Sequence, residues 1–247
     1  MSTSARMAID AMCAYTRDRG FDLRSPDQKL TYGNALIHRS RNLALACTRP
    51  DADVLFVDDD MLPPKEALVQ LLSHRVPVAS ALCTSRMPPI NLAVKLYDDA
   101  SHQFIPVERM RPDKLVTDKF GVGAAFLLLS RDTIERLKEY YVSSRDWLEA
   151  NRRCHDRMHV RAEFREKERA RKEEIRRANW DREKYLLVFD YPVGENELQF
   201  GEDIGLCWHL AQLGIPVSID TGVIVGHLGE HPYGPWDIPD QEEEAVA

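Results

Sequence analysis

Short apolar runs that alternate with amphipathic segments are the feature that most constrains the fold of this chain of 247 residues. Each run has the length of a buried strand, and several of the segments between them carry apolar residues at helical spacing. Strands that alternate with helices are typical of a layered α/β domain with a largely parallel sheet. The predicted strands are residues 54–57, 76–83, 121–130, 185–192, 215–220 and 222–229.

Helices are predicted between these strands from their spacing and from their start and stop residues. Gly20 and Gly214 should end two of them, and Ser130 is the predicted N-cap of a third. Residues 91–99 and 103–110 alternate in part between apolar and polar, which predicts an antiparallel pair of strands. The predicted helices are residues 5–19, 33–49, 65–74, 131–141 and 201–214.

The composition is that of a globular protein, with 44% hydrophobic and 30% charged residues. A net charge of −7 argues against a surface that coats nucleic acid throughout. The longest nearly apolar run, residues 121–129, is too short to span a bilayer, and residues 1–12 lack the apolar core of a signal peptide. The five cysteines are scattered, which favours reduced thiols. We therefore expect a cytoplasmic protein without a membrane span.

Residues 143–184 differ from the rest of the chain, because they contain no glycine or proline and carry 14 Lys/Arg against 10 Asp/Glu. We predict a long helix or a helical hairpin that is inserted into the domain. Arginines recur in it at every fourth position and would form a basic ridge, which a nucleic-acid backbone could neutralise. Glu–Lys and Glu–Arg pairs at the same spacing favour a solvated or self-associating helix instead. The ridge consists of Arg153, Arg157, Arg161, Arg165 and Arg169.

Three consecutive aspartates, Asp58, Asp59 and Asp60, directly follow the predicted strand 54–57. Like charges this close repel one another unless a cation lies among them or the side chains diverge into water. Ligands of α/β sheets bind outside the carboxyl ends of strands, and hard divalent cations take carboxylate oxygens. The run therefore predicts a site for a metal-diphosphate. A helix-capping turn is the alternative, because acids also favour helix N-termini.

A second set of polar residues follows in the last fifth of the chain. Glu202 and Asp203 lie in the first turn of a predicted helix, where a carboxylate is stabilised and could accept a proton from a hydroxyl. His227 lies at the end of a predicted strand and could complete a metal shell as a neutral imidazole. Each feature alone is common in structural roles. Their order along the chain, after the aspartate run and a further apolar strand, makes a functional site more specific.

These motifs resemble those of the GT-A class of nucleotide-sugar-dependent glycosyltransferases, in particular compact bacterial and phage members. The resemblance implies a GT-A (Rossmann-like) fold, with a mixed, mainly parallel sheet flanked by helices, the charged insertion, and the family's first strand missing. It also implies a division of the chain into a nucleotide-sugar-binding half (1–142), the insertion (143–184), an acceptor and metal-completing half (185–236) and an acidic tail (237–247). The matching residues are Arg41-Asn42, Asp58 and Asp60, residues 120–131, Glu202-Asp203 and His227.

The resemblance also implies roles for the matching residues. The metal, Mn²⁺ or Mg²⁺, would be held by Asp58, Asp60 and His227. Asp203 and Glu202 would be the catalytic base or the acids that position the acceptor. The nucleotide-sugar would be contacted by Arg41, Asn42, Asp58 and Asp59.

The predicted function is metal-dependent transfer of a hexosyl or pentosyl group from a nucleotide-sugar to a hydroxyl, on a modified nucleobase or a glycan. Two alternatives remain open. A nucleotidyl- or phosphoryltransferase would use the same acidic metal site on a nucleoside triphosphate. A catalytically idle module would only bind sugar nucleotides or nucleic acid, through the helical insertion.

Overall fold

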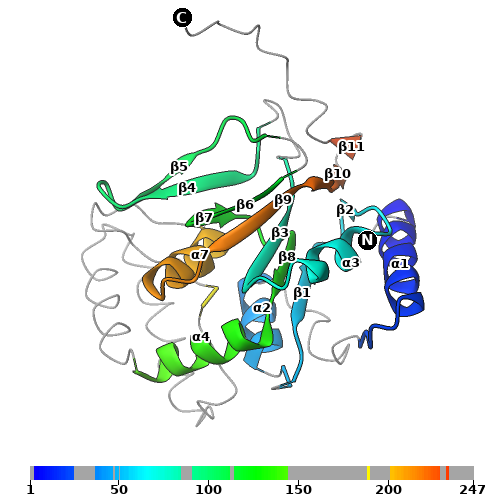
Figure 1. Cartoon of the computed structure of the whole chain (residues 1–247), viewed down its shortest axis with the longest axis horizontal. Coiled ribbons are helices and arrows are strands. Elements are labelled where there is room, and N and C mark those ends of the chain that lie inside the picture. Colours follow the sequence, from blue (N-terminus) through cyan, green and yellow to red (C-terminus); the bar gives the residue numbers. More distant parts are fainter. Residues whose placement is uncertain are drawn as a thin grey trace, which may run out of the picture.

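A sheet of five strands lies at the centre of the computed structural model, with helices on both of its faces (Figure 1). Two smaller sheets of three strands each adjoin it. The structure describes residues 3–24, 37–46, 48–49, 51–84, 91–111, 114–143, 188–189, 201–228 and 232–233.

The central sheet has the strand order β1-β8-β3-β9-β6. Strands β1 and β3 are both antiparallel to β8, β3 is parallel to β9, and β9 is antiparallel to β6. Only one of the four pairings is therefore parallel. The strands are β1 (Val54–Val57), β8 (Phe126–Leu129), β3 (Val78–Leu82), β9 (Val217–Ile224) and β6 (Leu115–Asp118).

The predicted Rossmann-like GT-A fold with a mainly parallel sheet is therefore wrong. The chain is a mixed α/β protein with three small sheets, and its main sheet is mostly antiparallel. The physical reason lies in β8, whose four residues are all buried. A strand covered on both faces has a continuous apolar sequence, which is the usual sign of a parallel strand. The run therefore reveals that β8 is buried but not the direction in which it runs.

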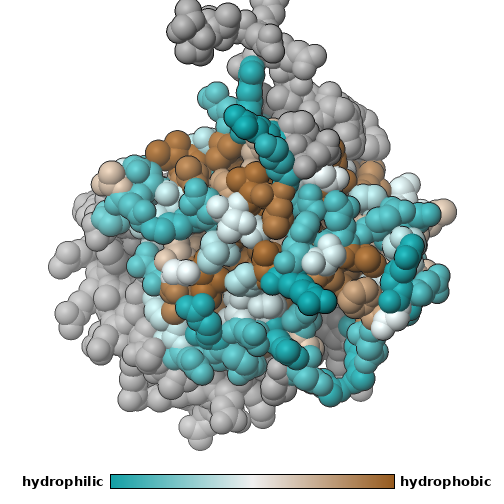
Figure 2. Space-filling view, in the orientation of Figure 1, coloured by the Kyte–Doolittle hydropathy of each residue, from teal (hydrophilic) through white to brown (hydrophobic). Residues whose placement is uncertain are grey.

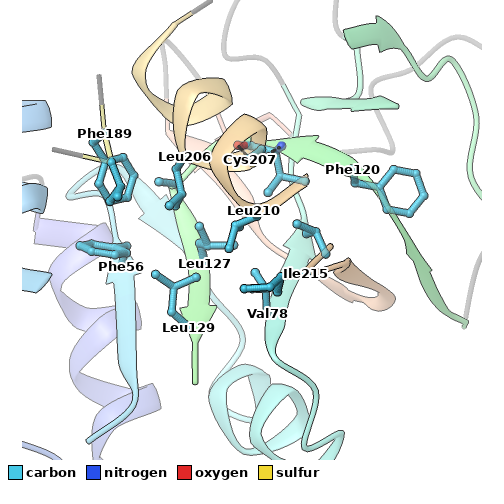
Figure 3. Close-up of a cluster of buried hydrophobic side chains, with 14 of the residues drawn as sticks. Phe56, Val78, Phe120, Leu127, Leu129, Phe189, Leu206, Cys207, Leu210 and Ile215 are labelled. Atoms are coloured by element: carbon cyan, nitrogen blue, oxygen red, sulfur yellow. Dashed lines mark hydrogen bonds between the residues drawn. The ribbon is translucent and has the colours of Figure 1, made fainter. Parts of the chain in front are cut away.

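Alternate residues of the strands contribute to two apolar clusters on opposite faces of the central sheet. Leu127 and Leu129 of β8 pack in the cluster that includes residues of α2 (Ile37–Ala46), α4 (Arg131–Ser143) and α7 (Glu202–Gln212) (Figure 3). Phe126 and Leu128 pack with α1 (Thr3–Asp18) and α3 (Ala67–Ser73). This alternation is what the period of a strand requires. The domain consequently has three layers, helix, sheet and helix.

One part of the predicted arrangement is retained. Because β1 and β3 both oppose β8, and β9 parallels β3, the strands β1, β3 and β9 run in the same direction. Their carboxyl ends therefore lie at one edge of the sheet. Asp58 follows β1 at this edge, and β10 (Gly226–Leu228) continues from the end of β9.

The smaller sheets shape the same region. Strands β4 (Val94–Asp98), β5 (Gln103–Pro106) and β7 (Phe120–Val122) form an antiparallel sheet, which confirms the predicted antiparallel pair. The second sheet joins β2 (Met61–Leu62), β10 and β11 (Pro232–Tyr233). On the face shown in Figure 2, apolar side chains form small areas that polar side chains separate.

Most of the predicted helices are confirmed, with shifts of a few residues at their ends. Gly20 and Gly214 follow α1 and α7 with positive φ, and the Ser130 hydroxyl accepts a hydrogen bond from the Thr133 amide at the start of α4. No helix among the described residues is long and apolar enough to cross a membrane. The predicted insertion, its basic ridge and the acidic tail lie outside the described residues. Of the predicted strand 185–192, only residues 188–189 are described, and they are not in a strand.

Candidate functional site

The three consecutive aspartates form a tight turn at the carboxyl end of β1. The Asp58 amide donates to the Ala125 carbonyl at 3.0 Å, and the Asp58 carbonyl accepts from the Met61 amide at 3.3 Å. The turn leads into β2, while α3 begins only at Ala67. The run therefore does not cap a helix, which excludes that alternative.

The side chains of the turn diverge to different partners, which limits their mutual repulsion. Asp58 is directed at the guanidinium of Arg41, and Asp60 lies against the imidazole of His227. Asp59 is exposed. The turn thus contributes to two neighbouring groups of polar side chains, which are described in turn below.

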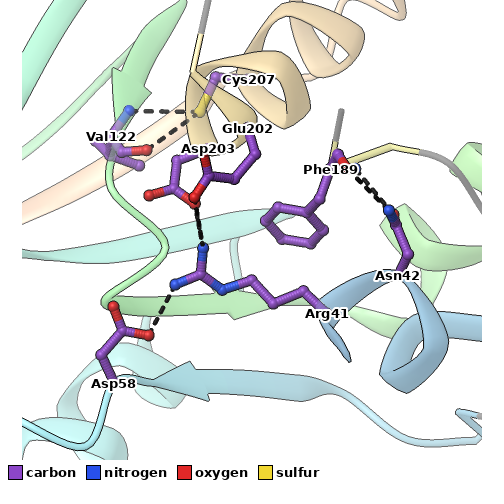
Figure 4. A network of polar contacts seen from close by, with 8 residues as sticks. All are labelled: Arg41, Asn42, Asp58, Val122, Phe189, Glu202, Asp203 and Cys207. Carbon is purple, nitrogen blue, oxygen red and sulfur yellow. Dashed lines mark hydrogen bonds and ion pairs between the residues drawn. The ribbon is translucent and has the colours of Figure 1, made fainter. Parts of the chain in front are cut away.

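Arg41 is the centre of the first group (Figure 4). One terminal nitrogen of its guanidinium donates to Asp58 Oδ1 at 2.7 Å, and the other donates to Asp203 Oδ1. Glu202 Oε1 lies 4.0 Å from the second nitrogen. The Arg41 side chain is only 7% exposed, so a single buried cation joins the end of β1 to the start of α7.

Asn42, the neighbour of Arg41, fixes this arrangement from the other side. Its side-chain amide donates to the Phe189 carbonyl at 2.8 Å, and its oxygen accepts from the Val188 and Phe189 amides at 2.9 Å each. These contacts hold the Phe189 ring against the Arg41 guanidinium, 5.6 Å from its centre, and edge-on to Phe56. Asn42 is fully buried. Its contact with a nucleotide stays a prediction, while its contacts here position Arg41.

Asp203 is held at the start of α7 by several contacts. Gly201 is the helix N-cap, and the Cys207 thiol one turn later donates to the Val122 carbonyl and accepts from the Val122 amide, which ties α7 to β7. Burial raises the pKa of Asp203 to about 6, against the opposing effects of Arg41 and a hydrogen bond from the Ala124 amide. The carboxylate nevertheless remains 28% exposed. It can therefore meet a ligand and is basic enough to accept a proton near neutral pH.

His227 and Asp60 form the second group. Register places His227 of β10 opposite Met61 of β2, so its imidazole reaches the aspartate turn. Its Nε2 lies 3.1 Å from Asp60 Oδ2, and its Nδ1 lies 3.2 Å from the Thr84 carbonyl. A carbonyl oxygen only accepts hydrogen bonds, so Nδ1 carries a proton and Nε2 is directed at the carboxylate. The Leu228 amide also donates to the Asp60 carbonyl at 2.8 Å.

The structure thus brings most of the predicted site residues together, in two groups rather than one. Asp60 and His227 adjoin each other as predicted, but Asp58 is paired with Arg41. No group of three His, Cys, Asp or Glu side chains within the described ranges is close enough to hold a metal by itself. A cation at Asp60 and His227 would need further ligands from water or a substrate.

Three features of the site were missed from the sequence. The pairing of Arg41 with two carboxylates depends on residues up to 162 positions apart, and no local pattern reveals it. The Thr84 carbonyl orients His227, and the Thr84 hydroxyl is buried without a hydrogen-bond partner among the described residues. Gly121 is needed for close packing, because a Cβ there would lie 2.7 Å from the Phe104 ring. A glycine in an apolar strand is the one sequence signal that points to such an approach.

The chain was compared with protein-family models, with curated proteins and with solved structures, and none of the three comparisons found a match.

Proposed function

We propose that this protein is a metal-dependent glycosyltransferase that moves a sugar from a nucleotide-sugar to a hydroxyl acceptor. The observation that carries the proposal is the pair of Asp60 and His227, oriented by Thr84, beside the partly exposed carboxylate of Asp203. The order of the motifs along the chain, with its resemblance to nucleotide-sugar glycosyltransferases, adds support. A nucleotide-sugar as the donor and a hydroxyl as the acceptor are both part of this proposal.

The chemistry of the pair fits a divalent cation. Metal-bound histidines commonly donate their second N–H to a backbone carbonyl, as His227 does to Thr84. Adjacent ligands of an octahedral cation with bonds of about 2.1 Å lie about 3 Å apart. The separation of 3.1 Å between His227 Nε2 and Asp60 Oδ2 agrees with that spacing. Mg²⁺ and Mn²⁺ accept one or two protein ligands and complete their shell with water and phosphate oxygens.

When bound, such a cation would stabilise the negative charge that develops on the leaving nucleoside diphosphate. The chain supplies the rest. Asp60 and His227 would hold the cation, while Asp203 accepts the proton of the attacking hydroxyl. Arg41 and the Ala124 amide hold the Asp203 carboxylate in place for that transfer. In this proposal Glu202, which is 26% exposed at the same helix start, orients the acceptor.

The proposal is tested by incubating the purified protein with Mn²⁺ and a panel of nucleotide-sugars, and by measuring release of nucleoside diphosphate. We expect release from one donor that EDTA abolishes and that Asp60→Asn, His227→Gln and Asp203→Asn each reduce at least about a hundredfold. The matched control is Asp51→Asn, an exposed aspartate before β1, which should leave the rate unchanged.

Two results would contradict the proposal. Consumption of a nucleoside triphosphate with release of pyrophosphate would identify a nucleotidyltransferase instead. Absence of turnover and of Mn²⁺ binding would leave His227 and Asp60 as a simple ion pair, in which an imidazolium donates to both Thr84 and Asp60.

A further inference from the structure

Arg41 is a buried cation that lies between two carboxylates of the candidate site. Both terminal nitrogens of its guanidinium are already used, one by Asp58 and one by Asp203. Hydrogen bonds between charged groups are about twice as strong as those between neutral groups. A phosphate that approached either of these two N–H groups would have to displace the carboxylate bound there.

The guanidinium and the two carboxylates differ in their exposure to solvent. The Arg41 side chain is 7% exposed and lies against Phe189, whereas the Asp58 and Asp203 side chains are 37% and 28% exposed. Solvent therefore reaches the carboxylates while the guanidinium is covered. A dissolved cation can approach Asp58 from outside, where it meets a carboxylate that already has a cationic partner.

Negative charges outnumber positive charges around Arg41. One guanidinium is shared by Asp58 and Asp203 and has Glu202 at 4.0 Å, and Asp60 belongs to the same turn as Asp58. The cluster keeps an excess of negative charge, which attracts a divalent cation. Arg41 reduces that attraction and at the same time engages Asp58, the first aspartate of the turn that also contains Asp60.

We propose that Arg41 is a built-in counter-cation that withholds Asp58 from the divalent cation and so limits how tightly the site binds that cation on its own. The inference rests on the proposed function, because it places the cation at Asp60 and His227. It goes further by assigning Asp58 to Arg41 in the free protein. In that state Asp60 and His227 are the pair that the described part of the chain presents to a free cation, and the site depends on oxygens of the substrate to complete the shell.

The proposal makes Arg41 a positioning residue with a measurable effect on metal affinity rather than on chemistry alone. Removal of its charge leaves Asp58 available as a third ligand and removes a repulsive charge near the cation. The loss of one positive charge from a partly buried acidic cluster, together with the release of a carboxylate, raises cation affinity by about tenfold or more. Arg41→Gln should therefore bind Mn²⁺ at least about tenfold more tightly than the wild type.

The experiment titrates the purified full chain with Mn²⁺ alone and follows the electron paramagnetic resonance signal of free Mn²⁺. Wild type is compared with Arg41→Gln, with Arg41→Lys and with the double variant Arg41→Gln/Asp58→Asn. The matched control is Arg49→Gln, which removes the same charge from an exposed pair with Asp51 at the opposite end of β1. Arg41→Lys retains the charge but cannot bridge two carboxylates, so it keeps the test informative if Arg41→Gln unfolds.

Support requires tighter Mn²⁺ binding in Arg41→Gln, a smaller gain in Arg41→Lys, an unchanged affinity in Arg49→Gln, and loss of the gain in the double variant. A gain that survives in the double variant would overturn the role of Asp58. Mn²⁺ binding by the wild type, with no gain in folded Arg41→Gln, would overturn this inference and leave the proposed function intact. Absence of Mn²⁺ binding in every variant would overturn both.

Discussion

Asp203 offers a direct test of the balance between burial and ion pairing at the site. Its pKa is raised from 3.8 to about 6, first by burial, although Arg41 acts in the opposite direction. Between these two pH values the folded protein binds more protons than the unfolded chain at this residue, so its contribution to stability falls as the pH rises. A shift of about two units corresponds to a loss of roughly 3 kcal/mol in the free energy of unfolding, and this loss is complete above pH 6.

Asp203→Asn removes this charge and retains an oxygen that can accept from Arg41 and from the Ala124 amide. We expect the variant to gain stability relative to wild type as the pH rises from 4 to 8, by up to about 3 kcal/mol. The measurement is urea unfolding of both proteins at several pH values, with the difference in free energy of unfolding plotted against pH. The same variant should lose transferase activity, as expected where function is maintained at a cost in stability.

The matched control is Asp98→Asn in β4. Hydrogen bonds from the Ser101 hydroxyl and the Ala100 amide lower the pKa of Asp98, which therefore stabilises the fold above its unfolded pKa. Its variant should lose stability relative to wild type as the pH rises, which is the opposite trend. If Asp203→Asn also loses stability with rising pH, the ion pair with Arg41 outweighs burial and the reasoning is refuted.

Three further substitutions test the framework of the site by chemical denaturation. Thr84→Val replaces a buried hydroxyl without a partner among the described residues, so we expect unchanged stability or a gain of about 1 kcal/mol; a clear loss would reveal a partner. Asn42→Ala should cost about 2–4 kcal/mol, because it leaves three buried backbone groups unpaired, and a loss below 1 kcal/mol would contradict that. Gly121→Ala should cost about 1–3 kcal/mol, because its Cβ would lie 2.7 Å from Phe104. Gly201→Ala, which has open space around it, should cost less than about 1 kcal/mol, because it only exchanges a glycine N-cap for a poorer one.

The candidate site was only partly predictable from the sequence. Asp60, Asp203 and His227 were predicted as candidates from their order along the chain, because each feature alone is common in structural roles. Their division into two groups could not be predicted, because Asp60 and His227 lie 167 positions apart and Arg41 lies 162 positions from Asp203. Which carboxylate meets which partner depends on side-chain geometry in the assembled sheet edge.

The sequence by itself determined which segments are buried and where most of the helices begin and end. Burial follows from apolar residues in runs or at helical spacing, and helix ends follow from local glycine and serine chemistry at Gly20, Ser130 and Gly214. Only the tertiary structure decided the direction of β8 and the pairing of Asp58 with Arg41. A strand buried on both faces has the same apolar sequence in either direction, and a carboxylate finds its partner only when distant elements have packed together.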